Sequence, residues 1–164
     1  MKLINKLSIV VSVYNEEAVL DKFYETILPI LEEIDSDYEL IFVNDGSRDA
    51  SPAILDRLAM DSKKVKVIHF SRNYGHEAAM IAGIDYSSGD GIVCMDADLQ
   101  HPVECIPQIL DTFNQGYEVI SMVRTANKSA GFVKNLTSGL FYKILNKISE
   151  VHFEENASDF FAIT

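Results

Sequence analysis

Cysteine is scarce in this sequence, with Cys94 and Cys105 the only two among 164 residues. They do not form a Cys-x-x-Cys pair, and Cys94 lies within an apolar run at residues 91–95. We therefore expect both thiols to be reduced and buried. The scarcity of cysteine excludes a disulfide-stabilised scaffold and gives no support to a zinc centre.

Long apolar runs are also absent. No uninterrupted apolar stretch reaches the roughly 18 residues needed to cross a bilayer. Residues 1–6 lead into a segment that is too short and too β-branched for a signal peptide. A hydrophobic content of 48% suits a globular core, so we expect a single cytoplasmic domain over residues 1–164. The apolar stretch at residues 160–163 has no closing element, and we expect this domain to be truncated at its C-terminus.

Basic residues are few: the sequence has 14 Lys and Arg against 25 Asp and Glu, which gives a net charge of −11. Such a surface repels phosphates, which excludes general nucleic-acid binding. The charge is nevertheless uneven, since no acidic residue lies between Glu118 and Glu150. The basic residues in that window are Arg124, Lys128, Lys134, Lys143 and Lys147. Residues 132–148 also carry apolar residues at helical spacing, which predicts a basic amphipathic helix that packs on the sheet or lies on a membrane surface.

Short β-branched runs alternate with helical patterns along most of the chain. The predicted strands are residues 7–13, 39–44, 65–70, 91–95 and 117–123, and the predicted helices are residues 18–34, 51–60, 77–86 and 102–115. This order predicts an α/β fold with a largely parallel, twisted sheet and helices on both faces. Ligands then bind at the carboxyl ends of the strands, where the loops 14–17, 45–49, 71–76 and 96–101 meet.

The loop from Asp96 to Gln100 is the most informative of these. Alternation would let Asp96, Asp98 and Gln100 point the same way, while Pro102 opens the next helix. Hard oxygen ligands of this kind suit Mg²⁺ or Mn²⁺. The alternative interpretation is an acidic turn between a strand and a helix.

Several other polar residues have two interpretations. Asp45, beside Gly46, is placed to accept a hydrogen bond from a base or ribose, or it belongs to a turn that caps the next helix. Glu17 and Asp49 are expected in first helical turns, where acids favour the dipole. His101 either caps the helix at Pro102 or touches phosphate.

Four motifs, at residues 13–17, 44–49, 71–76 and 96–102, together resemble the family 2 glycosyltransferases of the GT-A fold. The most similar branch is the polyprenyl-phosphate glycosyltransferases, the group of dolichyl-phosphate mannose synthase and the bactoprenol glucosyltransferases. The resemblance covers essentially the whole chain. It implies an inverting, metal-dependent transfer of a hexose from a UDP- or GDP-sugar to a polyprenyl phosphate, for cell-envelope glycan synthesis at the cytoplasmic face of the membrane.

The resemblance also implies a role for each matched residue. The implied donor-nucleotide contacts are Val13, Tyr14, Glu16, Asp45, Arg72 and Asp96. The implied ligands of Mg²⁺ or Mn²⁺ are Asp96, Asp98 and Gln100. The implied catalytic residues are Asp98, Asp159 and Arg124, and the implied acceptor-phosphate contacts are Lys134 and Ser138. Gly139 stands where the family commonly has an arginine, so one positive charge of the acceptor site is missing.

Two rival functions stay open. The same transfer onto a saccharide or protein acceptor would need a general base, for which Asp159 is the candidate. A non-catalytic nucleotide-sugar-binding module is the other rival, and the intact Asp98 and Gln100 argue against it. Full-length relatives usually continue into membrane-anchoring helices, so we expect a membrane surface as a partner, and a homo-oligomer stays open.

Overall fold

The computed structural model describes residues 3–123 and 157–164. The chain divides into two compact units, residues 1–120 with 159–164 and residues 121–158, and the candidate site lies within the first. The elements in chain order are β1 (Lys6–Val13), α1 (Leu20–Glu33), β2 (Asp37–Asn44), α2 (Ser51–Asp61), β3 (Val65–His69), α3 (His76–Tyr86), β4 (Gly91–Asp96), the 3₁₀ turn η1 (Val103–Cys105), α4 (Ile106–Asn114), β5 (Val119–Val123) and β6 (Ala157–Ile163).

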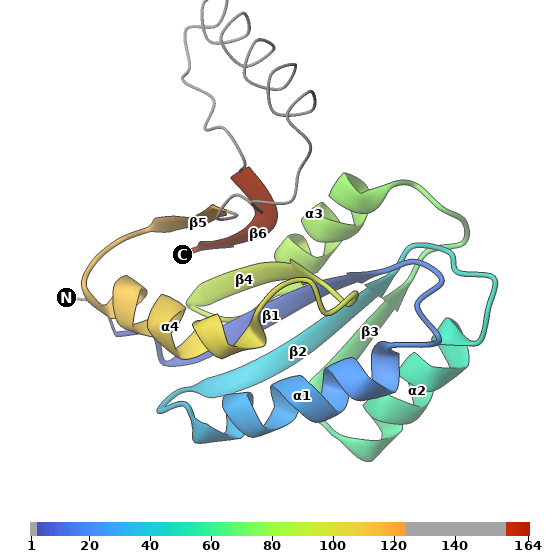
Figure 1. Cartoon of the computed structure of the whole chain (residues 1–164), viewed down its shortest axis with the longest axis horizontal. Helices are drawn as coiled ribbons and strands as arrows, with labels where there is room; N and C mark the ends of the chain where they lie inside the picture. Colours follow the sequence, from blue (N-terminus) through green and yellow to red (C-terminus); the bar gives the residue numbers. More distant parts are fainter. Residues whose placement is uncertain (1–2, 124–156) are drawn as a thin grey trace, which may run out of the picture. The chain divides into compact units, whose positions relative to one another are not determined.

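A six-stranded sheet in the order β3-β2-β1-β4-β6-β5 organises the described residues (Figure 1). β1 pairs in parallel with both β2 and β4, and β2 pairs in parallel with β3. β6 pairs antiparallel with β4. The prediction of an α/β fold with a largely parallel sheet is confirmed.

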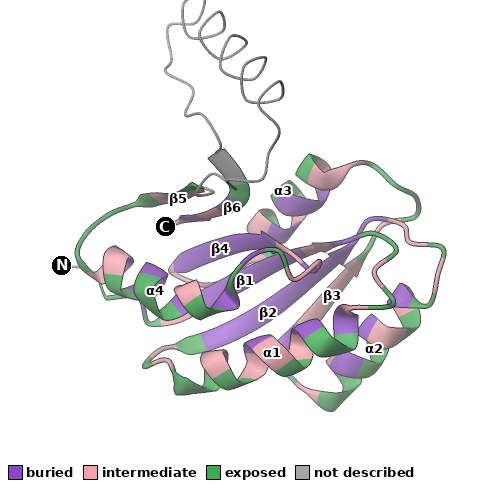
Figure 2. Ribbon diagram, in the orientation of Figure 1, coloured by how far each residue is buried: buried purple, intermediate pink, exposed green. Residues whose placement is uncertain are grey.

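Helices cover both faces of this sheet, with α1 and α4 on one face and α3 on the other (Figure 1). Phe23 of α1 meets Phe42 of β2 edge to face, with ring centroids 6.1 Å apart. On the opposite face, Ala79 and Met80 of α3 join Val10 in a buried cluster. The central strands are therefore buried along most of their length (Figure 2), which explains why their sequences are continuous apolar runs.

Gly83 brings α3 directly onto the sheet. A Cβ at this position would lie 2.2 Å from Cγ1 of Val10 and 3.2 Å from Cγ2 of Val43, closer than van der Waals contact allows. The close approach fixes the height of α3 above β1. It thereby also fixes the position of His76, the first residue of that helix.

A buried polar network occupies the α3 face at the amino ends of the strands. The Glu39 carboxylate, 2% exposed, accepts hydrogen bonds from Lys66 Nζ at 2.6 Å and Lys6 Nζ at 3.0 Å. Its other oxygen accepts from Ser8 Oγ at 2.6 Å and from the Ser88 amide at 2.7 Å. Burial alone would raise the pKa of Glu39, but these hydrogen bonds outweigh it and hold the pKa well below its ordinary value.

The segment predicted as one helix over residues 102–115 is divided. Pro102 has extended backbone, η1 follows it, and α4 begins only at Ile106. Pro107 lies in the first turn of α4, where its missing N–H leaves no helical hydrogen bond unmade. The prediction that Pro102 opens the helix is therefore wrong.

Both cysteines are free thiols. Cys94 is fully buried, and burial raises its pKa to about 12, so that the thiol stays protonated at neutral pH. Cys105 is only partly buried, which corrects the expectation that both would be buried.

Among the described residues, no helix has both the length and the apolar character needed to span a membrane. The predicted helix over residues 132–148 lies outside the described residues, as do Arg124, Lys134, Ser138 and Gly139.

Candidate functional site

A cavity of about 400 Å³ opens at the carboxyl ends of β1, β2 and β4. The loops that the sequence pattern predicted at this edge do meet there. The cavity is lined by Ser12, Val13, Tyr14, Glu16, Asp45, Asn73, Gly75, His76, Asp96, Ala97 and Asp98. Of the residues implied as donor contacts, only Arg72 is not among the lining residues.

The loops after β1 and β2 are tied together by hydrogen bonds. The amide of Glu16 donates to Ser51 Oγ at 2.9 Å, and the amide of Glu17 donates to Asp49 Oδ2 at 3.1 Å. Glu17 Oε2 in turn accepts from the Ala50 amide at 2.7 Å. Because α1 begins at Leu20 and α2 at Ser51, Glu17 and Asp49 lie before these helices. The prediction of first-turn dipole acids is wrong, and the two carboxylates instead join neighbouring loops.

Asp45 is buried at the wall of the cavity and holds the loop after β3. Its carboxylate oxygens accept hydrogen bonds from the amides of Tyr74 at 2.6 Å and Gly75 at 3.0 Å. Next to it, Gly46 has a positive φ of +68°, and a Cβ there would lie 2.3 Å from the Arg72 carbonyl carbon. Only glycine permits this contact, so the two loops interlock.

Arg72 lies on the outer side of the same loop. Its side chain is exposed, and the guanidinium carbon lies 4.7 Å above the ring centroid of Tyr74, a cation–π geometry. The Phe70 ring meets Tyr74 edge to face at 5.5 Å. The aromatic pair therefore supports the arginine beside the cavity, and a role for Arg72 toward a donor remains a prediction.

The acidic turn after β4 departs from simple alternation. β4 ends at Asp96, and Leu99 adopts a left-handed conformation with a φ of 61°. Asp96 and Asp98 both line the cavity, and Asp98 Oδ1 accepts the Gln100 amide at 2.9 Å. Gln100 itself is exposed and is not among the lining residues. In this structure Gln100 therefore does not line the cavity with the two carboxylates, and its ligand role remains a prediction.

His101 contacts the backbone of Asp96 and the ring of Phe160. Its side chain is buried, Nδ1 accepts the Asp96 amide at 3.1 Å, and its ring stacks on Phe160 at a centroid distance of 5.2 Å. His101 therefore holds the backbone of Asp96 beside Phe160 of β6, and its contact with a phosphate remains a prediction.

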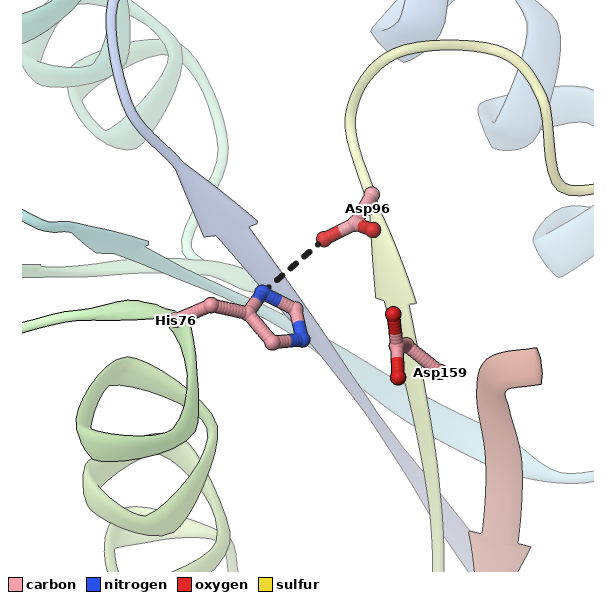
Figure 3. Close-up of side chains that lie close together, drawn as sticks. All are labelled: His76, Asp96 and Asp159. Carbon is pink, nitrogen blue, oxygen red and sulfur yellow. Dashed lines mark ion pairs between the residues drawn. The ribbon is translucent and has the colours of Figure 1, made fainter. Parts of the chain in front are cut away.

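His76, Asp96 and Asp159 come together beside the cavity (Figure 3). His76 Nδ1 lies 3.3 Å from Asp96 Oδ1, and one potential ligand atom from each residue lies within 4.8 Å of the others. The sequence analysis did not connect His76 with Asp159. No local motif carries that information, because the antiparallel pairing of β6 with β4 brings Asp159 to this edge.

The electrostatics of the cavity favour a cation. Partial burial raises the pKa of Glu16, and the negative charges of Asp98, Asp96 and Asp49 raise it further. The carboxylate oxygens of Asp96, Asp98 and Asp159 are hard ligands of the kind that suits Mn²⁺ or Mg²⁺. The residues present therefore fit the divalent ion that the sequence predicted.

An α/β sheet with helices on both faces, and a carboxylate-lined cavity at the carboxyl ends of its parallel strands, agrees with the GT-A fold of glycosyltransferases that the sequence motifs resemble. The chain belongs to glycosyl transferase family 2, whose family model matches residues 8–163. This confirms the family resemblance of the sequence motifs.

Named relatives share the same region. The chain is 39% identical over 155 residues to a bactoprenol glucosyl transferase of Shigella phage SfV, covering 94% of this chain and 50% of the relative. It is 42% identical over 153 residues to an uncharacterized glycosyltransferase of Bacillus subtilis, covering 93% of this chain and 47% of the relative. The chain therefore spans about half the length of the curated relatives it matches.

Solved structures share the fold at lower identity. Glucosyl-3-phosphoglycerate synthase from Mycobacterium tuberculosis, in complex with Mn²⁺, UDP-glucose and phosphoglyceric acid, has a TM-score of 0.67 at 21% identity, covering 98% of this chain and 56% of that one. A mannosyltransferase from Pyrobaculum calidifontis, in complex with GDP-mannose and Mn²⁺, has a TM-score of 0.62 at 17% identity, covering 99% of this chain and 45% of that one.

Proposed function

We propose that this domain transfers a hexose from a UDP- or GDP-sugar to a polyprenyl phosphate, with inversion at the anomeric carbon. The observation that carries the proposal is the cavity at the carboxyl ends of β1, β2 and β4, lined by Glu16, Asp45, Asp96 and Asp98. The relatives named as bactoprenol glucosyl transferases support the acceptor class. Complexes of fold relatives with UDP-glucose and with GDP-mannose support the donor class.

The donor nucleotide occupies the wall formed by the first two loops. Val13 closes the cavity at the end of β1, while the exposed Tyr14 offers a ring at its mouth. The Asp45 oxygens already accept two amides, and each retains lone-pair capacity for a further donor from a base or ribose. Arg72, on the neighbouring loop, supplies positive charge.

The diphosphate end lies toward Asp96. A bound Mg²⁺ or Mn²⁺ would be held by Asp96 with Asp98 and Gln100, as the motif implies, or with His76 and Asp159, as the geometry allows. When bound, the ion neutralises charge that develops on the departing nucleoside diphosphate. The carboxylates of the chain supply its ligands and take no part in proton transfer.

A phosphate acceptor needs no deprotonation by the protein. The acceptor oxygen forms the new bond to the anomeric carbon while the bond to the donor β-phosphate breaks on the opposite side. Because a phosphate is already ionised near neutral pH, no general base is required, and positioning supplies most of the rate. A saccharide or protein acceptor is the second candidate, because the exposed Asp159 lies beside the cavity where a base would act.

The acceptor side of the proposal rests on sequence. Residues 119–149 contain no acidic residue, and Arg124, Lys134 and Ser138 in that segment would contact the acceptor phosphate. A basic apolar segment suits the cytoplasmic face of a membrane, where anionic lipids attract it. A homo-oligomer remains compatible with this arrangement.

The test is product formation from labelled UDP-glucose and GDP-mannose with Mn²⁺, offered polyprenyl phosphate in vesicles or a free saccharide. We expect glycosyl polyprenyl phosphate that Asp98→Ala abolishes, whereas Asp111→Ala, an exposed carboxylate change on α4, leaves it intact. Product on the saccharide alone would favour the second candidate. Donor binding without product on any acceptor would indicate a binding module and refute the proposal.

A further inference from the structure

Ser12 connects His76 to Asp96 at the rim of the cavity. It lies directly opposite Asp96 in the parallel register of β1 and β4. Its hydroxyl donates to Asp96 Oδ1 at 2.6 Å and lies 3.0 Å from His76 Nδ1. His76 and Asp96 are about one-third and one-quarter exposed, so the cluster is shielded on one side and open to the cavity on the other.

The hydrogen bonds of Ser12 indicate which ring nitrogen of His76 carries a proton. A serine hydroxyl has one proton, and an ionised carboxylate can only accept. Because Ser12 gives its proton to Asp96, the short contact to His76 requires that Nδ1 carry a hydrogen and donate. The second ring nitrogen, Nε2, lies on the side of Asp159 in Figure 3.

The same chain of contacts reaches the nucleoside wall. Asp45 accepts the amide of Gly75, which precedes α3 with a φ of +102°. His76 follows as the first residue of α3, and Gly83 seats that helix on Val10. A continuous series of contacts thus runs from Asp45 through Gly75, His76 and Ser12 to Asp96.

We propose that Ser12 and His76 are positioning residues that fix the Asp96 carboxylate for the divalent ion. Ser12 donates to Oδ1 and His76 supports Ser12 through Nδ1, which leaves Oδ2 to receive the ion, and the link to Asp45 couples the ion end of the cavity to its nucleoside end. The inference rests on the proposed function, because it takes the ion at Asp96 from it. It goes further because it assigns His76 a supporting role toward Asp96 through Nδ1. The competing role for His76 is direct ligation of the ion through Nε2.

Two pairs of substitutions separate these roles. The amide nitrogen of asparagine can take the place of Nδ1, whereas the amide oxygen of glutamine reaches the place of Nε2. We expect His76→Asn to bind Mn²⁺ as the wild type does and His76→Gln to bind it about tenfold more weakly, the usual loss when the partner of a metal ligand is removed. Ser12→Ala should show a similar loss, and Ser12→Thr, which keeps the hydroxyl, should not.

The measurements are Mn²⁺ titration with and without UDP, and ¹⁵N spectra of the imidazole nitrogens in the metal-free wild type. The spectra test the proton on Nδ1 without any variant, and melting temperatures show that each variant folds. Mn²⁺ binding that survives in His76→Gln and fails in His76→Asn would overturn the inference in favour of ligation, as would a proton on Nε2 alone. Equal affinity in all variants would overturn it too. A wild type that binds neither Mn²⁺ nor UDP would instead refute the proposed function.

Discussion

Replacing Glu39 with glutamine should destabilise the domain in a manner that depends on pH. One carboxylate oxygen accepts Ser8 and the Ser88 amide, which the glutamine oxygen can retain. The other oxygen accepts Lys6 and Lys66, and an amide NH₂ in its place would face two ammonium donors. Glu39→Gln therefore loses two charge-assisted hydrogen bonds and keeps the neutral ones.

The expected cost is moderate because the lysines reach water. Hydrogen bonds to charged groups contribute about 1.5–3 kcal/mol each. Lys6 and Lys66 are 31% and 35% exposed and regain hydration when released, so the total loss is about 2 kcal/mol at pH 7. For a domain of this size such a loss lowers the melting temperature by about 4–8 °C.

The pH dependence follows from the depressed pKa of Glu39. In the unfolded chain this carboxyl has its ordinary pKa of 4.5, whereas in the folded protein its pKa is lower and it stays ionised to lower pH. Its stabilisation is therefore complete above about pH 4.5 and is lost as the pH falls toward the folded pKa. The difference between wild type and Glu39→Gln should shrink by about 1.4 kcal/mol per pH unit below that value and close within about 1.5 units.

Urea unfolding followed by circular dichroism between pH 7 and pH 3 measures both effects. Glu25→Gln, an exposed carboxylate change on α1, is the matched control and should behave as the wild type does. Equal stability of Glu39→Gln and wild type at pH 7, or a difference that stays constant down to pH 3, would refute the reasoning.

Three further changes test other parts of the molecule. Gly46→Ala should lower the unfolding free energy by at least about 1–2 kcal/mol, because an alanine there would adopt a left-handed backbone. It should also weaken UDP binding, because the added Cβ would push the two loops apart. Unaltered urea unfolding would contradict this. Asp98→Ala should remove the Mn²⁺-dependent part of nucleotide-sugar affinity in calorimetry and leave the melting temperature nearly unchanged, since the residue lies in a loop. Unchanged affinity would end the case for its ligand role. A Lys134/Lys143/Lys147→Glu triple variant should sediment less with anionic vesicles, because each lysine near such a surface contributes about 1 kcal/mol that salt weakens. Equal sedimentation of both proteins would contradict this expectation.

The strands and helices of the described region could be predicted closely because their signals are local. The apolar run at residues 7–13 became β1, buried on both faces, and the pattern at residues 51–60 became α2 almost unchanged. The helix predicted at residues 102–115 was divided, since Pro102 and Pro107 permit two different starts and the sequence does not rank them.

The candidate site could also be predicted only in part. The loops after β1, β2 and β4 were predicted at the cavity because parallel strands end at one edge, a rule that needs no side-chain detail. The positions of Gln100 and His101 were not predictable, because they depend on the left-handed turn at Leu99 and on stacking against Phe160. The grouping of His76 with Asp159 depends on strand pairing across a long separation in sequence.

β6 joins the sheet late in the order of synthesis. β1 to β4 pair in parallel with one another and are complete before Ala97 is made, so that the nucleoside wall can assemble from the nascent chain. β6 cannot pair with β4 until all the residues between the two strands have been made. Asp159 and the Phe160 ring that stacks on His101 are therefore synthesised after every other described residue of the ion end, so the nucleoside wall and the ion end are completed at different points of synthesis.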